Sequence, residues 1–269
     1  MLLTVAPAWA LVNGEAPAGD ERQFDAVGAF SRSKWILPGG EQEHRWFGAA
    51  TLVAPDRILT ARHLLPDGQA PDKPGQFAVR FRRRPDGGLG SKQAGAESYH
   101  HVRITRWKLA PRGDLAIGYL EDPVTHIRPM PVRLEPLELD GEPGQLAAWG
   151  SESRWMGEAA PRRGLRVGET RLQHERGGGM VRFVDWRARR KQKGTDDAGR
   201  PVFKPWISSD AAVPNMYDSG GAVLVKRDGR WQLAGIVSTY THGTWLAPFA
   251  DRAGFPLAEL IAGEDGADR

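Results

Sequence analysis

The chain has 269 residues, enough for one large or two small domains with a sizeable core. Its 33 glycines and 20 prolines favour an all-β protein with many turns and short strands. Because there is no cysteine, disulfides, a cysteine nucleophile and a thiolate metal site are all excluded. The net charge of +4 is too small to imply a nucleic-acid partner by itself.

The first ten residues are apolar and end in Ala8-Trp9-Ala10, which fits a signal-peptidase site. No basic segment precedes the apolar run, so we interpret residues 1–10 as a signal-peptide remnant whose start lies upstream of Met1. The alternative is a buried or frayed N-terminal segment. The signal interpretation predicts a secreted or periplasmic protein. No other stretch is long and apolar enough to span a bilayer.

The first half of the chain contains short apolar or alternating runs that are typical of strands. A Pro55-Asp56 turn joins two of these runs, His63 directly follows the second, and Asp114 opens the last. The run Arg82-Arg83-Arg84 is interpreted as a solvated rim, with a phosphate-binding patch as the less favoured alternative. The residues predicted as strands are 26–30, 46–53, 58–61, 77–81 and 114–120.

A proline-rich, weakly periodic segment at residues 126–140 predicts a linker that crosses between two halves, residues 11–125 and 141–269. In the second half, a charged loop at 187–200 is expected to be exposed. A short helix is expected over residues 255–263, since proline suits its first turn and Gly263 can close it. Strand character is found at residues 146–150, 162–170, 179–184, 222–225, 233–238 and 246–249.

An Asp228-Gly229 turn between two apolar runs predicts a β-hairpin, because this pair tolerates the positive φ angles of a tight turn. The cluster Asp218-Ser219-Gly220-Gly221 lies just before the first strand of the hairpin. Taken alone, this cluster fits an ordinary turn as well as an exposed serine nucleophile. A serine nucleophile needs a base and an acid that orients the base, and His63 and Asp114 each lie beside a predicted strand.

With these residues in the order His, Asp, Ser, the chain resembles the trypsin/chymotrypsin-like serine proteases. The matching segments span nearly the whole chain, from about residue 11 to the C-terminal helix. The segment LAAWG at 146–150 fits the family less tightly. The segments that match better are GAATLVA at 48–54, LTARH at 59–63, DLAI at 114–117, DSGG at 218–221 and GIVS at 235–238.

The resemblance implies two six-stranded antiparallel β-barrels with a C-terminal helix, packed across a cleft, and a serine endopeptidase that acts through an acyl-enzyme. Ser219 would be the nucleophile, His63 the general base and Asp114 the residue that orients it. The backbone N–H groups of Tyr217 and Ser219 would form the oxyanion hole. A freed N-terminus at Leu11 would pair with Asp218 and order the loop before the nucleophile.

Two positions depart from the family pattern. Tyr217 stands where the family usually carries glycine, and a tyrosine bears the required backbone angle only with strain. Arg62 stands where the family usually carries a small residue, and its bulk is harmless if it points to solvent.

Substrate recognition is assigned to the segment around Ser219. Val213, six residues before Ser219, takes the place of the aspartate of trypsin-like members, so cleavage after Lys or Arg is disfavoured. Ser238, Thr239 and Tyr240 are expected to line the substrate strand and the wall of the pocket.

No metal or organic cofactor is implied, and we expect a monomer that acts on polypeptides. A second hypothesis is a latent, protease-like binding or regulatory domain. Tyr217 and the arginine-rich, charged loop at 187–200 motivate it. A third and less favoured one, nucleic-acid binding through the arginine clusters, predicts a steep salt dependence of affinity.

Overall fold

The structure is a computed structural model of the full chain. The residues that it describes are 11, 14–17, 21–34, 43–71, 76–83, 98–136, 142–149, 164–174, 180–184, 191–195, 201–204, 212, 214, 217–239, 242–252 and 254–263.

The first half of the chain forms a closed antiparallel barrel of six strands in the order β1-β2-β3-β6-β5-β4. Pairing of β1 with β4 closes the ring, and apolar side chains of alternating residues such as Phe77, Val79 and Phe81 fill it. The strands are β1 (Val27–Lys34), β2 (Glu43–Ala54), β3 (Arg57–Thr60), β4 (Phe77–Arg83), β5 (Ser98–Leu109) and β6 (Ala116–Leu120).

The second half forms another antiparallel sheet, in the order β12-β13-β14-β9-β8-β7, in which β12 also pairs with β7. The two-residue turn between β12 and β13 has φ values of 48° at Asp228 and 74° at Gly229, as the hairpin prediction required. The strands are β7 (Glu142–Trp149), β8 (Leu165–His174), β9 (Met180–Val184), β12 (Ala222–Arg227), β13 (Arg230–Val237) and β14 (His242–Trp245).

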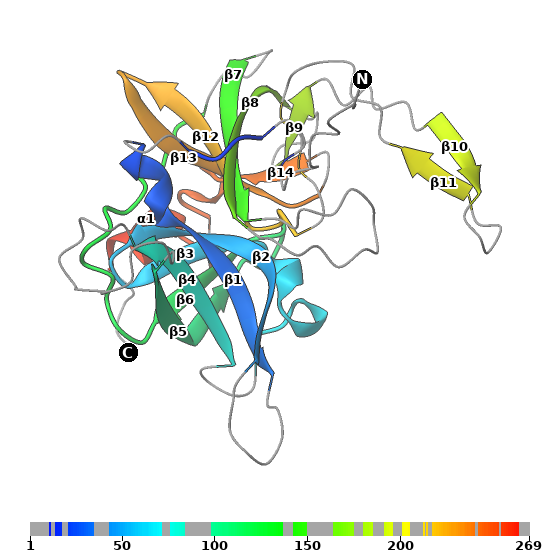
Figure 1. Ribbon diagram of the computed structural model, residues 1–269. Coiled ribbons are helices and arrows are strands. Elements are labelled where there is room, and N and C mark those ends of the chain that lie inside the picture. The colour runs from blue at the N-terminus through cyan, green and yellow to red at the C-terminus, as the bar shows by residue number, and fades with distance from the viewer. Residues whose placement is uncertain are drawn as a thin grey trace.

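A separate two-stranded sheet, β10 (Lys191–Thr195) with β11 (Pro201–Lys204), stands apart from both halves in Figure 1. The helix α1 (Leu257–Ala262) packs Leu257 and Leu260 into the same hydrophobic cluster as the first barrel. No helix in the described ranges is long and apolar enough to cross a membrane. The 3-10 helices are η1 (Arg22–Ala26), η2 (Arg62–Leu64), η3 (Pro66–Gly68) and η4 (Ala247–Phe249).

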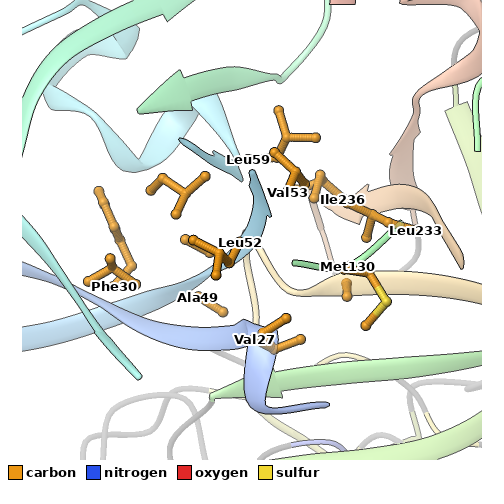
Figure 2. Close-up of a cluster of buried hydrophobic side chains, with 14 of the residues drawn as sticks. Val27, Phe30, Ala49, Leu52, Val53, Leu59, Met130, Leu233 and Ile236 are labelled. Atoms are coloured by element: carbon orange, nitrogen blue, oxygen red, sulfur yellow. The ribbon is translucent and has the colours of Figure 1, made fainter. Parts of the chain in front are cut away.

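One hydrophobic cluster extends across both halves. Figure 2 shows Leu52 and Val53 of β2 in the same buried cluster as Leu233 and Ile236 of β13, together with Met130 of the crossing segment. The crossing segment also pairs with β13, because Arg133 N–H donates to Leu233 O (2.8 Å) and Leu233 N–H donates to Pro131 O (2.7 Å). This cluster therefore spans the junction of the two halves and fixes the residues there, while a second cluster, which includes Leu146, Val223 and Trp245, lies within the second half.

The mostly-β class, the closed first barrel and the short C-terminal helix are confirmed. The predicted strand at 246–249 is wrong: the helix η4 occupies Ala247–Phe249, and the last strand, β14, ends just before it at Trp245. Pro248 lacks the N–H that a sheet ladder needs, which accounts for the shift. Strand β5 was not predicted, because its exposed cations interrupt the apolar pattern, and Asp114 lies before β6 rather than within it.

Candidate active site

His63 lies in η2, immediately after β3 ends. Ala61 is extended, and the chain then turns, with Leu64 N–H donating to Ala61 O (3.2 Å) and Leu65 N–H to Arg62 O (3.0 Å). The His63 side chain remains 46% exposed. The end of a barrel strand thus holds the imidazole at the surface, where it can contact a ligand.

Asp114 lies in the loop between β5 and β6, which is closed by a hydrogen bond from Ala110 N–H to Leu115 O (3.0 Å). Its two carboxylate oxygens both bind His63: the backbone N–H donates to Oδ1 (2.8 Å), and Nδ1 lies 2.6 Å from Oδ2. Because a carboxylate accepts hydrogen bonds, Nδ1 carries a proton and Nε2 is the ring nitrogen left to accept one from another group.

Two hydroxyl groups of the second half also bind Asp114. Ser238 Oγ donates to Asp114 Oδ2, and Thr244 Oγ1 donates to the Asp114 backbone oxygen (3.2 Å). Sequence analysis placed Ser238 only in the substrate strand and did not single out Thr244. No local sequence signal points to these two contacts, because they span 124 and 130 residues.

The environment of Asp114 acts on its ionisation in two directions. Burial opposes the charged form, but the hydrogen bonds from His63 and Ser238 and the proximity of the His63 imidazole outweigh it. The net effect holds the pKa of the Asp114 carboxyl below its ordinary value. Asp114 is therefore an anion near neutral pH and can stabilise a positive charge on His63.

Ser219 lies in the tight turn before β12, where Gly221 N–H donates to Asp218 O (2.9 Å). The turn is pressed against the first barrel, since Ala49 N–H donates to Ser219 O (2.8 Å). At Gly220 the φ angle is +82°, and a Cβ atom would lie 2.0 Å from Ala49 O. Only glycine fits there, so Gly220 is required by the packing of one half on the other.

The Ser219 hydroxyl points to Ser238, whose side chain binds Asp114. Ser219 Oγ donates to Ser238 O at 3.5 Å, and among the hydrogen bonds of the described residues none joins Ser219 Oγ to His63. Ser238 thus binds Asp114 with its side chain and Ser219 with its carbonyl. A chain of hydrogen bonds thus links His63 to Asp114, Asp114 to the Ser238 side chain, and the Ser238 carbonyl to Ser219 Oγ.

Tyr217 adopts a left-handed backbone conformation with φ of +71°. This is the strained geometry that the sequence predicted for a tyrosine at a position that favours glycine. In the described part of the chain, Ser219 N–H donates no hydrogen bond to another protein group. The backbone N–H of Ser219 can therefore donate to a ligand atom at this turn.

The remaining predicted residues differ in what the structure describes. Leu11 and Asp218 are both fully buried, and Glu15 pairs with Val167 of β8, but an ion pair of the Leu11 amino group with Asp218 stays a prediction. Ser238 is buried and Thr239 exposed, and the N–H groups of both donate to His242 O. Val213 and Tyr240 lie outside the described residues.

Arg62 does not point freely to solvent. It is half-buried and donates from Nε to Gly68 O (2.7 Å) and from Nη1 to Ala110 O (2.9 Å). Among the described residues, no group of three or more His, Asp or Glu side chains is placed to hold a metal ion.

The chain matches no protein-family model and no curated protein at a significant level. The assignment of a function therefore depends on the geometry of the site and on the motifs in the sequence.

Proposed function

We propose that this protein is a serine endopeptidase that resembles the trypsin/chymotrypsin-like proteases and hydrolyses peptide bonds through an acyl-enzyme. The observation that carries the proposal is the double contact of Asp114 with His63, at the backbone N–H (2.8 Å) and at Nδ1 (2.6 Å). This arrangement orients the imidazole with Nε2 available as a base, close to the turn that carries Ser219.

In the proposed reaction, the Ser219 hydroxyl rotates from Ser238 O toward His63 Nε2, which takes its proton as Oγ attacks the substrate carbonyl. Asp114 stabilises the resulting imidazolium, which then protonates the leaving amine. Water repeats the sequence on the acyl-enzyme and releases the second product. The N–H groups of Ser219 and Tyr217 stabilise the oxyanion, and one such donor is typically worth about 3 kcal/mol.

The preference for a substrate side chain is proposed from the sequence. With Val213 in place of an acidic residue, nothing would pair a buried Lys or Arg side chain, so cleavage after other residues is expected. The Ala8-Trp9-Ala10 motif supports secretion or export to the periplasm.

The test is labelling of the purified protein, starting at Leu11, with a fluorophosphonate probe read by intact mass. We expect one adduct, lost in Ser219→Ala. It should be retained in Ser31→Ala, which removes a buried serine of the first barrel whose Oγ donates to Ala78 O. Absence of an adduct from both the wild type and Tyr217→Gly would contradict an activated serine.

A second candidate, a latent protease-like binding domain, is favoured by two observations. Tyr217 has a φ of +71°, and Ser219 Oγ lies on Ser238 O. If the strained tyrosine prevents the oxyanion hole from forming, the site would bind a peptide without cleaving it. Peptide binding by a protein that never reacts with the probe would support this alternative.

A further inference from the structure

Arg62 joins the two loops that carry the acid and the base of the candidate site. Its Nε donates to Gly68 O (2.7 Å), and its Nη1 donates to Ala110 O (2.9 Å), 48 residues further along the chain. Both acceptors are backbone carbonyl groups. The planar guanidinium can bind both at once because its N–H donors are fixed in a fork.

Each carbonyl belongs to a loop that is itself closed by backbone hydrogen bonds. Gly68 N–H donates to Leu65 O (3.0 Å), two residues after His63, so the Gly68 carbonyl is at the end of the turn that follows the imidazole. Ala110 is fully buried, and its N–H donates to Leu115 O (3.0 Å), which closes the loop that contains Asp114. Arg62 therefore connects the end of the histidine turn, residues 62–68, to the base of the aspartate loop, residues 110–115.

We infer that Arg62 is a positioning residue that holds His63 and Asp114 at hydrogen-bonding distance; this inference depends on the proposed function. The chain has no cysteine, so no disulfide can fix the histidine turn. Within the described contacts, Arg62 is the side chain that joins this turn to the aspartate loop apart from the His63–Asp114 pair itself. Without the Arg62 side chain, each loop keeps its own backbone hydrogen bonds, but the two hydrogen bonds that hold one loop at a fixed distance from the other are lost.

The first test compares Arg62→Ala and Arg62→Lys with Arg133→Ala. Arg133 is a matched control, because it is half-buried and donates from Nη1 to Gln232 Oε1 (3.3 Å) in the crossing segment, outside the site. We expect Arg62→Ala to lower kcat for an ester substrate by about tenfold to about 100-fold, with KM little changed. Lysine has one point charge and no fork, so Arg62→Lys should recover only part of the loss.

Added guanidinium chloride at low millimolar concentration should raise kcat of Arg62→Ala and leave Arg133→Ala unchanged, because the free cation can occupy the place of the lost side chain. A general loss of stability would not be reversed in this way. Equal kcat values for Arg62→Ala and the wild type would overturn the inference, as would a loss of kcat that Arg133→Ala reproduces.

The second test does not depend on catalysis. In the Ser219→Ala background, proton NMR reports the low-field resonance of the His63 Nδ1–H, which the 2.6 Å hydrogen bond to Asp114 deshields. We expect this resonance to broaden or disappear in Ser219→Ala/Arg62→Ala and to persist in Ser219→Ala/Arg133→Ala. Its persistence in both would contradict the role of Arg62, whereas failure of the probe to label Ser219 would contradict only the proposed function.

Discussion

At the scale of single residues, Tyr217 carries the greatest conformational cost at the site. A non-glycine residue in the left-handed region costs roughly 1–2 kcal/mol, and its φ of +71° places Tyr217 there. Such strain is retained where the surrounding structure imposes it, as the turn against Ala49 does here. The left-handed backbone at this position is therefore imposed by the turn, and a glycine could adopt it without strain.

We predict that Tyr217→Gly preserves or raises turnover. Glycine removes the strain but adds freedom to the unfolded chain, so the free energy of unfolding should change by no more than about 1 kcal/mol. Tyr217→Ala is the matched control, because it removes the phenol and keeps the Cβ atom. Ester hydrolysis and urea unfolding measure both effects. A large loss of turnover in both variants would show that the tyrosine ring contacts the substrate.

At the scale of elements, the turn before β12 is fixed by its packing against β2. Gly220 has φ of +82°, and a Cβ atom there would lie 2.0 Å from Ala49 O and 2.4 Å from Thr60 Oγ1. Thr60 Oγ1 in turn donates to Ala49 O (2.7 Å), so neither atom can move away cheaply. The position of Ser219 thus depends on β2 and β3 as much as on its own loop.

We predict that Gly220→Ala lowers the free energy of unfolding by about 2–5 kcal/mol, the sum of backbone strain and overpacking. Gly229→Ala separates the two causes, since Gly229 has φ of +74° but nothing lies within 4 Å of its added Cβ. This control should lose only the backbone part, about 1–2 kcal/mol. Equal losses in urea unfolding of the two variants would rule out the steric contact with Ala49.

Sequence patterns located the elements that have strong local signals. The Asp228-Gly229 hairpin is such a case, because a two-residue turn with positive φ values is encoded by the turn residues themselves. Strand β5 was missed because Arg103, Arg106 and Lys108 occupy its exposed positions, and the apolar alternation is confined to a few residues such as Val102 and Ile104. The bond from Ser238 to Asp114 could not be predicted, since it depends on how two distant halves pack.

At the scale of the whole molecule, the candidate site is built from both halves around one carboxylate. Asp114 comes from the first barrel, whereas Ser238 and Thr244, which bind it, come from the second half. The shared core that contains Leu52, Met130 and Leu233 holds these partners together. Ionisation of Asp114 is therefore coupled to the association of the two halves, and so to global folding.

This coupling predicts the pH dependence of stability. Folding lowers the pKa of Asp114, so its contribution is fully present above the pKa of the unfolded chain, about 3.9, and is lost as the pH falls through the folded value. The wild type should exceed Asp114→Asn in free energy of unfolding at pH 6. The difference should shrink below about pH 4, by about 1.4 kcal/mol for each pH unit by which folding lowers this pKa. Urea unfolding of both proteins from pH 6 to pH 2 measures it. A difference that stays constant over that range would show that the Asp114 carboxylate does not stabilise the junction through its charge.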